Sequence, residues 1–348
     1  MKIIKLRRPI SAGIILTYKC TSECKHCMYA CSPRRENVWM NKHLFEFIVE
    51  RITSITSHVY RGTRNRIHGI NYGFHLTGGE PFINFQLLSS YVKSASNIGL
   101  PSMFVETNCF WCNSDNDVVD RLTILRRTGL HGILISVNPF MLEYVDFRNV
   151  KRCLRIALNI FGSSNTMVYH PYFYKQAENM NIEGKMAFDE YLRIALSKGY
   201  SLTDIFNPYI LLPMGRLCYQ LNRFYDRKDA KFYIGEECLD ELTRPWHIHM
   251  DCYGNYIPGY CSGISIGSVW SINEMIEVGV DLSDKPVIEA LSKGIGELYR
   301  LAIEGYGYKP LNEGYISKCH LCLDIRRYLA LDVGGFKDLQ PVEFYEYL

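Results

Sequence analysis

The 348-residue chain contains no apolar run that approaches the roughly 18–20 residues of a membrane helix. Its basic first eight residues are like the start of a signal peptide, but the apolar stretch at residues 12–16 is too short and no small-residue cleavage site follows. The net charge is only +3, from 39 Lys and Arg against 36 Asp and Glu, which makes nucleic acid an unlikely partner. Repeats and low-complexity tracts are also missing. We therefore predict a folded, cytoplasmic protein with no membrane partner.

Cysteine is abundant, with thirteen residues. An odd, high count in a large chain without a secretion signal argues against a disulfide framework and favours metal or redox chemistry. Four of them lie within twelve residues near the N-terminus, and five lie between residues 238 and 322. This grouping predicts two metal sites in two domains. The positions are Cys20, Cys24, Cys27, Cys31, Cys109, Cys112, Cys153, Cys218, Cys238, Cys252, Cys261, Cys319 and Cys322.

Short β-branched runs alternate with helical patterns over the first 215 residues. Such an order predicts an α/β fold, a parallel sheet with helices outside it. About six repeats in 200 residues suit a partial (β/α)6 TIM-like barrel, because a complete eightfold barrel needs about 250 residues. The expected strands are residues 13–17, 73–77, 103–107, 131–137, 166–172 and 209–212, and the expected helices are residues 41–55, 84–98, 117–129, 149–162 and 183–199.

The composition and the secondary-structure pattern of the sequence change near residue 216. Residues 235–270 are rich in Gly, Cys, His and Tyr, which is typical of a small domain stabilised by a metal. We therefore divide the chain into a barrel at residues 1–215 and a cysteine-rich domain at residues 216–348. Helices are expected at residues 274–278, with Asn273 as N-cap, at 287–303 and at 323–331.

The N-terminal cysteines form a C-x3-C-x2-C motif, with Cys20, Cys24 and Cys27 directly after the first expected strand. One short loop lets three thiolates reach the same metal cluster at little entropic cost. Three ligands instead of four would leave one position open for chemistry. The alternative for these cysteines is a structural zinc loop with a distant fourth ligand.

This motif closely resembles the signature of the radical S-adenosylmethionine (SAM) superfamily, although His26 replaces the usual Phe or Tyr before the third cysteine. The resemblance implies that the three cysteines hold a 4Fe–4S cluster whose open iron binds SAM. It also implies reductive cleavage of SAM to a radical that abstracts a substrate hydrogen, with an electron donor such as flavodoxin or ferredoxin.

Further segments resemble the family in the same order. The second expected strand runs into Gly78-Gly79-Glu80-Pro81, like the family's GGEP motif. There, glycines allow close approach to the SAM amino group, and the Glu80 carboxylate accepts its hydrogen bonds. By itself, each of these segments is an ordinary turn or cap. The other residues that the resemblance assigns to SAM are Asn108, Ser136, Asn138 and Arg216.

The C-terminal cysteines resemble the auxiliary-cluster domains called SPASM or, in shorter form, Twitch. Six cysteines beyond residue 216 are too few for two clusters, so the resemblance implies one auxiliary 4Fe–4S cluster. We expect Cys238, Cys261, Cys319 and Cys322 to hold it, and the spacing leaves open whether Cys252 replaces Cys261. A zinc ribbon built from the same residues is the alternative.

Several other residues could take part in catalysis. Cys109 and Cys112 form a second C-x2-C motif, which is compatible either with a reactive thiol at Cys112 or with two packed thiols. Cys153 is expected to be a core residue. Polar and apolar residues alternate at residues 246–251, which is the pattern of a strand and would put His247, His249 and Asp251 on one face. These three residues could be a base or substrate contacts, or they could form a polar surface. The basic stretches at residues 34–35 and 61–66 are expected to be solvated loops.

Together these features predict a radical SAM enzyme that modifies a peptide or protein side chain. A small-molecule dehydrogenase or rearrangement enzyme, acting on a sugar, an alcohol or a cofactor precursor, is the alternative within the family. The first strand begins by residue 14, which leaves no room for a leader-peptide domain and weakens the case for ribosomal peptides. A third possibility, from another class, is a zinc-stabilised binding protein without catalysis.

Overall fold

The computed structural model describes residues 2–60 and 72–348, so the basic stretch at residues 61–66 lies outside the described residues. The chain divides into two units. The sheet unit comprises residues 10–24 and 31–207, and the C-terminal unit comprises residues 1–9, 25–30 and 208–348. Two segments of the C-terminal unit, residues 1–9 and 25–30, therefore come from the region that the sequence assigns to the barrel.

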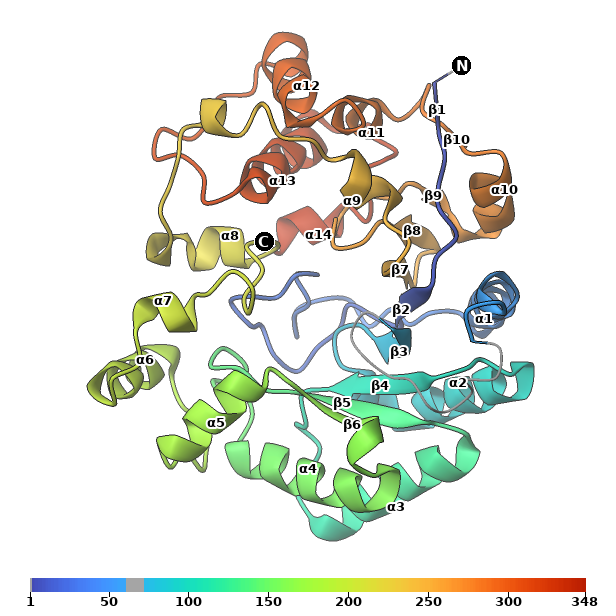
Figure 1. Ribbon diagram of the computed structural model, residues 1–348, viewed down its shortest axis with the longest axis vertical. Coiled ribbons are helices and arrows are strands. Elements are labelled where there is room, and N and C mark those ends of the chain that lie inside the picture. Colours follow the sequence, from blue (N-terminus) through green and yellow to red (C-terminus); the bar gives the residue numbers. More distant parts are fainter. Residues whose placement is uncertain (1, 61–71) are drawn as a thin grey trace. The chain divides into compact units, whose positions relative to one another are not determined.

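Five parallel strands form the core of the sheet unit, in the order β6-β5-β4-β3-β2 (Figure 1). Each pair of neighbours is parallel and in continuous register. Four of the strands are almost wholly buried, which explains their near-continuous apolar sequences. The strands are β2 (Ser11–Ile15), β3 (Gly73–Thr77), β4 (Met103–Thr107), β5 (Gly132–Ser136) and β6 (Thr166–Tyr169).

Helices connect these strands, and consecutive helices pack against one another, α1 on α2, α2 on α3 and α3 on α4. Polar caps set their beginnings: the side chains of Asn41, Asn84 and Ser114 accept hydrogen bonds from the first turns. Left-handed Gly99 and Gly129 end α2 and α3. The helices are α1 (Lys42–Thr56), α2 (Phe85–Ile98), α3 (Asp115–Thr128), α4 (Phe147–Phe161), α5 (Pro171–Asn179), α6 (Phe188–Ser197) and α7 (Leu202–Ile205).

The predicted α/β order with a parallel sheet is confirmed, but two details are wrong. Residues 209–212 form turns instead of a sixth strand. Pro208 and Pro213 flank this segment, and proline cannot donate a ladder hydrogen bond. Of its side chains, Leu211 is buried but Tyr209 is 92% exposed. The fifth strand ends at Tyr169, because Pro171 begins α5, a helix that the sequence pattern did not reveal. Closure of the sheet into a barrel stays a prediction.

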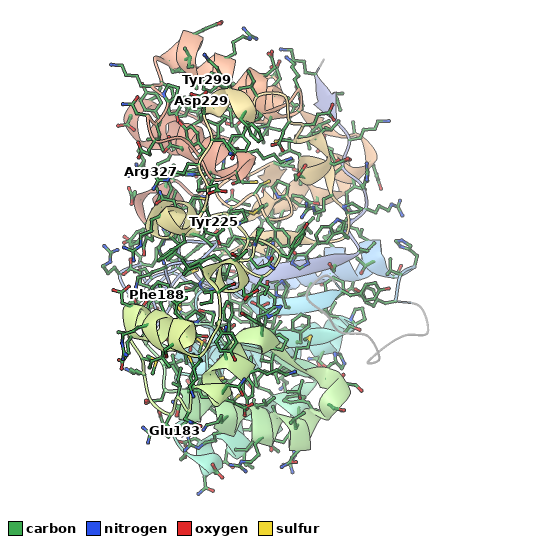
Figure 2. The ribbon with its side chains drawn as sticks, turned by 60° about the vertical axis from the view of Figure 1, so that its left-hand side comes forward. Glu183, Phe188, Tyr225, Asp229, Tyr299 and Arg327 are labelled. Atoms are coloured by element: carbon green, nitrogen blue, oxygen red, sulfur yellow. The ribbon has the colours of Figure 1, made fainter. Side chains whose placement is uncertain are left out.

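The interior of the sheet unit is also rich in aromatic rings. Phe188, which begins α6 and is labelled in Figure 2, packs its ring on Phe140 and Phe206, with centroid distances of 4.9 and 6.2 Å. Arg35 is buried, with its guanidinium 5.2 Å from the centre of the Tyr18 ring. The expectation of a solvated loop is therefore wrong at Arg35, whereas the exposed Arg34 pairs with Glu23.

The C-terminal unit combines small antiparallel sheets with short helices. Strand β7 (Ile248–Asp251) pairs with β8 (Asn255–Ile257), which pairs with β9 (Gly267–Ser268). Strand β1 (Ile3–Ile4) pairs with β10 (Val280–Asp281). The helices are α8 (Leu217–Gln220), α9 (Leu239–Thr243), α10 (Ile272–Glu277), α11 (Pro286–Leu291), α12 (Ile295–Arg300), α13 (Lys318–Tyr328) and α14 (Glu343–Glu346).

Three helical expectations in this unit need correction. Ser271, and not Asn273, is the residue before α10. The expected helix at residues 287–303 is interrupted: α11 ends at Leu291, and Gly294, with a positive φ of 118°, is the residue before α12. Helix α13 begins at Lys318, five residues before the expected start, because Ser317 caps it by accepting from the His320 amide. Cys319 and Cys322 therefore lie within the first turns of a helix.

Among the described residues, no helix combines the length and the apolar character needed to cross a bilayer.

Candidate functional site

The Gly78-Gly79 turn after β3 packs directly against the chain that leads into the N-terminal cysteines. The Gly79 amide donates to Thr17 O (2.7 Å) and the Glu80 amide donates to Lys19 O (3.0 Å). A Cβ on Gly79 would lie 1.8 Å from Lys19 O, and one on Gly78 would lie 2.3 Å from Thr17 O. Both glycines are therefore required for this backbone packing, a reason that differs from the predicted approach to a SAM amino group.

Glu80 is buried at the carboxyl end of the sheet. Its Oε1 accepts hydrogen bonds from the Phe82 amide (3.1 Å) and the Thr107 hydroxyl (3.0 Å), and its Oε2 accepts from the Asn108 amide (2.7 Å). Burial raises the pKa of Glu80 to about 7, although these hydrogen bonds oppose the rise. A cation beside this carboxyl would favour its charged form, so the site is suited to an ammonium group.

Asn108 connects this carboxyl to the first cysteine. Its backbone amide binds Glu80, while its side-chain Nδ2 donates to Thr21 Oγ1 (3.0 Å) and approaches the sulfur of Cys20 at 3.8 Å. The backbone amide of Ser22 also donates to the Cys20 sulfur, at 3.4 Å. Two N–H groups directed at one sulfur favour a thiolate, which is the form that binds metals.

The third cysteine of the motif is described within the C-terminal unit. The Cys27 carbonyl accepts from the Arg216 amide at 3.0 Å. Gly215, with φ of 57°, lies so close that a Cβ would be 2.6 Å from Cys27 O. Burial, followed by the charge of Arg216, lowers the pKa of His26 to about 4, so this ring is neutral. The segment that the resemblance assigned to SAM therefore adjoins Cys27.

Arg216 itself is completely buried, and its Nε donates to the Tyr347 carbonyl at 2.9 Å. Ser136 ends β5, where it is paired with Tyr169 in register. Asn138 follows, and its Oδ1 accepts from the Met141 amide at 2.9 Å. This bond makes Asn138 a cap of the following turn, and its predicted contact with SAM stays a prediction, as does that of Ser136.

The four predicted auxiliary ligands line one cavity within the C-terminal unit. Cys238, Cys261, Cys319 and Cys322 come from three separate parts of the chain. Burial, together with neighbouring cysteines, raises the pKa of Cys238, of Cys261 (to about 11) and of Cys319. Such a set of thiols would be stabilised as thiolates by a metal cluster, whose positive iron ions offset their mutual repulsion.

Two further features of this cavity favour bound thiolates. Cys319 and Cys322 lie in the first turns of α13, where the helix dipole favours negative charge. Arg326, one turn later on the same helix, is buried and donates from Nε to the Cys322 sulfur at 3.3 Å. Its Nη1 donates to Ser262 O (2.8 Å) and to the Tyr345 hydroxyl (2.9 Å), which holds the guanidinium in place. Cys252 is buried but does not line the cavity.

The weaker catalytic candidates are His247, directly before β7, and His249 and Asp251 on β7. All three are buried, so the alternative of a solvated polar surface is wrong. The Asp251 carboxylate accepts from the amides of Tyr253 (3.0 Å) and Asn255 (2.9 Å), which shapes the turn between β7 and β8. His249 Nδ1 lies 3.0 Å from Gly259 O, and its ring centre is 4.6 Å from that of His247. A catalytic role for these residues stays a prediction.

Cys112 belongs to a group that sequence reasoning missed. Cys109, Cys112 and Cys153 are all buried, and their sulfurs lie within 4.8 Å of one another. Hydrogen bonds from the other two thiols lower the pKa of Cys153, whereas burial raises the pKa of Cys109 and Cys112. The C-x2-C spacing was visible, but nothing in the sequence connects it to Cys153 on α4. Arg326 was missed in the same way, since no spacing rule ties an arginine to a cysteine ligand.

No family model and no curated protein matches the chain. Among solved structures, "BtrN in complex with AdoMet and 2-DOIA" is 12% identical with a TM-score of 0.41, and the match covers 78% of this chain and 83% of that one. "Native anSMEcpe with bound AdoMet" is also 12% identical with a TM-score of 0.39, and the match covers 92% of this chain and 97% of that one.

Proposed function

We propose that this protein is a radical SAM enzyme. The observation that carries the proposal is the double role of Asn108, whose backbone binds Glu80 and whose side chain binds the loop of Cys20. The two motifs that resemble the family most closely, C-x3-C-x2-C and Gly-Gly-Glu-Pro, are thus joined through one residue at the carboxyl end of a parallel sheet. This is the edge at which α/β enzymes place their chemistry.

The donor set at the first motif fits an iron–sulfur cluster. Cys20, Cys24 and Cys27 would hold it, and the two N–H groups directed at the Cys20 sulfur suit a ligating thiolate. The cluster and SAM, when bound, supply an electron and a carbon radical that removes a hydrogen atom from the substrate.

The chain's own residues would bind and orient SAM. The Glu80 carboxylate, ionised, would accept hydrogen bonds from the SAM ammonium, and its three protein hydrogen bonds fix its position. Gly78 and Gly79 keep the turn that carries Glu80 against residues 17–19. Because Glu80 and the loop of Cys20 are held by the same backbone, the amine site and this cluster ligand would keep a constant relation.

The cavity in the C-terminal unit supports a single auxiliary 4Fe–4S cluster. Cys238, Cys261, Cys319 and Cys322 line it together, which favours Cys261 over Cys252 as the fourth ligand. Arg326, buried at the Cys322 sulfur, would offset part of the negative charge of four thiolates. Iron rather than zinc is the proposed metal, because the ordered motifs and the cysteine order resemble this family over most of the chain.

For the substrate we propose a peptide or protein side chain, following the resemblance to SPASM and Twitch domains. A small alcohol or sugar is the alternative. Transfer of deuterium from the substrate to 5′-deoxyadenosine distinguishes the two. A deuterated cell extract is separated by gel filtration into small molecules and macromolecules, and each fraction is added to the enzyme together with SAM. Deuterium in the 5′-deoxyadenosine from the macromolecular fraction supports our proposal, and deuterium from the small-molecule fraction alone contradicts it.

The enzyme proposal is tested by anaerobic reconstitution, reduction and assay of 5′-deoxyadenosine. We expect about eight irons per chain, four per cluster, and release of 5′-deoxyadenosine. Cys24→Ala should abolish release, whereas the matched variant Cys31→Ala, four residues beyond the motif, should keep it. A fully reconstituted protein that forms no 5′-deoxyadenosine would refute the proposal, and a colourless protein with only zinc would support the binding-protein alternative.

A further inference from the structure

Three cysteine sulfurs meet inside the sheet unit, at a place that the proposed function does not use. Cys109 and Cys112 lie in the loop between β4 and α3, and Cys153 lies in the middle of α4. Each of the three residues is 0% exposed, and their sulfurs lie within 4.8 Å of one another. Cys153 lies 41 positions after Cys112 in the chain, so it is the packing of α4 that brings the third thiol to the pair.

The loop is fixed to α4 by polar side chains of the helix. Arg152 donates from Nη1 to Cys112 O at 2.6 Å, and Asn149 donates from Nδ2 to Asn113 Oδ1 at 3.1 Å. Arg152 also donates to Asn149 Oδ1 (3.1 Å), so the two side chains form a single network. These bonds join side chains of the helix to the carbonyl of Cys112 and the side chain of Asn113, as hydrogen bonds around metal ligands often do.

The loop also has a local geometry that directs both of its thiols inward. The Cys112 amide donates to Cys109 O at 3.1 Å, which closes a tight turn. Cys109 adopts φ of 65°, a left-handed conformation that is costly for a residue with a Cβ. The Trp111 ring lies on Phe82, with centroids 4.2 Å apart, and its Nε1 donates to Thr107 Oγ1. The turn is thus fixed by the buried Trp111 ring, while the sulfurs of Cys109 and Cys112 converge on that of Cys153.

Three thiolates around one metal ion require sulfurs at a definite separation. With metal–sulfur distances of about 2.3 Å, trigonal or tetrahedral geometry places the sulfurs roughly 4 Å apart. The observed limit of 4.8 Å therefore allows a shared ion after small side-chain adjustments. Sulfur ligands select thiophilic ions such as Zn²⁺ and Cu⁺ over Mg²⁺ or Ca²⁺.

Two explanations compete with metal coordination for the C-x2-C pair, the packing of buried thiols and a redox-active dithiol. Exchange with a partner requires an accessible attacking thiol, and here all three cysteines are fully buried. A redox pair also does not require a third thiol within 4.8 Å, supplied by a separate helix. Convergence of three thiols, and not two, favours metal coordination.

We propose that Cys109, Cys112 and Cys153 form a metal site for a single thiophilic d10 ion, Zn²⁺ or Cu⁺, which ties the loop after β4 to α4. Binding forms three metal–sulfur bonds and releases to solvent those protons that the thiols still carry, without any change in oxidation state. Because Thr107 and Asn108 precede this loop and bind Glu80, the ion would stabilise the carboxyl edge of the sheet. The proposal does not rest on the proposed function.

The test uses the full chain with both iron–sulfur clusters reconstituted, so that the cluster cysteines are occupied. The protein is incubated anaerobically with Zn²⁺ or, separately, with Cu⁺, freed of loose metal, and analysed for iron, zinc and copper by mass spectrometry. We expect one zinc or copper ion per chain in addition to the iron, and an X-ray absorption spectrum with three sulfurs at about 2.3 Å.

Cysteine variants test whether these residues bind the ion. Cys153→Ser and Cys112→Ser should lose the extra ion and keep their iron, while the matched control Cys31→Ser should keep both. If Cys153→Ser fails to fold, Cys112→Ser provides the same comparison from the loop side. A wild-type protein that takes up neither ion, an ion with fewer than three sulfur ligands, or its retention in Cys112→Ser would overturn the proposal. Failure of SAM cleavage would leave this result unaffected, since zinc and copper are counted separately from iron.

Discussion

The guanidinium of Arg326 donates from Nε to the sulfur of Cys322 across 3.3 Å, and both residues are buried. They lie four residues apart on α13, so the two side chains share one face of the helix. A buried cation at a ligand sulfur stabilises added negative charge on a cluster. If the proposed auxiliary cluster binds here, we expect this pair to set its reduction potential.

Replacing Arg326 by Gln should lower the reduction potential of the auxiliary cluster by about 60 mV or more, equivalent to a tenfold shift of a one-electron equilibrium. Arg326→Lys keeps the charge and should recover part of the loss. Potentiometric titration followed by electron paramagnetic resonance measures the change. The matched control is Arg327→Gln: this neighbour, labelled in Figure 2, is exposed and its guanidinium lies 5.6 Å from the Tyr219 ring centre. Equal shifts in both Gln variants would contradict the assignment.

Asn108→Ala should reduce 5′-deoxyadenosine formation about 10- to 100-fold, the usual effect of removing a partner of a metal ligand. The side-chain amide that binds Thr21 and approaches the Cys20 sulfur is lost, while the backbone bond to Glu80 remains. Steady-state assays at saturating SAM measure the effect. Asn84→Ala, which removes an asparagine cap of α2 in the same unit, should lower stability without this loss of rate. Wild-type rates in Asn108→Ala would show that the amide is dispensable.

Burial sets the pKa of Glu80 at about 7, so SAM affinity should depend on pH. Below this value the carboxyl is protonated and cannot pair with an ammonium, and affinity should fall about tenfold per pH unit. Above it, affinity should level off. Calorimetric titrations of SAM between about pH 6 and pH 8 test this, and Glu80→Gln should bind weakly and without the pH dependence. A wild-type affinity independent of pH would rule out a role for this titration.

The same pKa has a consequence for folding. Because the folded-state value exceeds the ordinary value of 4.5, the folded protein holds a proton that the unfolded chain releases between pH 4.5 and about 7. The contribution of Glu80 to stability is therefore largest at low pH and decreases as the pH rises through this interval. Urea titrations of the wild type and of Glu80→Gln at several pH values measure this contribution of Glu80 to the free energy of unfolding.

Gly79→Ala should lower the free energy of unfolding by more than about 2 kcal/mol, because the new Cβ would lie 1.8 Å from Lys19 O and the backbone has to move. Urea denaturation measures the change. Gly199→Ala is the control: Gly199 also has a positive φ, 88°, but a Cβ there meets open space. We expect only the left-handed penalty of about 1 kcal/mol in the control. Equal decreases in the free energy of unfolding in the two variants would mean that the close approach of Gly79 to Lys19 O does not exclude a Cβ.

Cys261→Ala should remove about four irons per chain, whereas Cys252→Ala should leave the iron content unchanged. The reason is that Cys261 lines the cavity with the three other cysteines and Cys252 does not. Iron analysis after reconstitution provides the measurement, with Cys322→Ala as the reference for complete loss of that cluster. The opposite pattern in the two variants would assign Cys252 as the ligand.

Much of the fold was predictable because its signals are local. Buried β-branched runs predict β2 to β5, and asparagine and serine caps with terminal glycines set the helix limits within a few residues. The failures are also local in origin. Residues 209–212 contain apolar side chains at strand-like density, but flanking prolines and an exposed Tyr209 leave the segment in turns.

The sequence by itself determined the cysteine spacings, the Gly-Gly-Glu-Pro turn and the parallel α/β order, because each depends on residues near one another in the chain. Only the tertiary structure decided that Asn108 joins Glu80 to the Cys20 loop, that Cys261 lines the cavity of the auxiliary cysteines, and that Cys153 meets Cys109 and Cys112. These contacts join residues that are distant along the chain. The packing of strands and helices determines which of these residues meet, and the local sequence pattern does not show it.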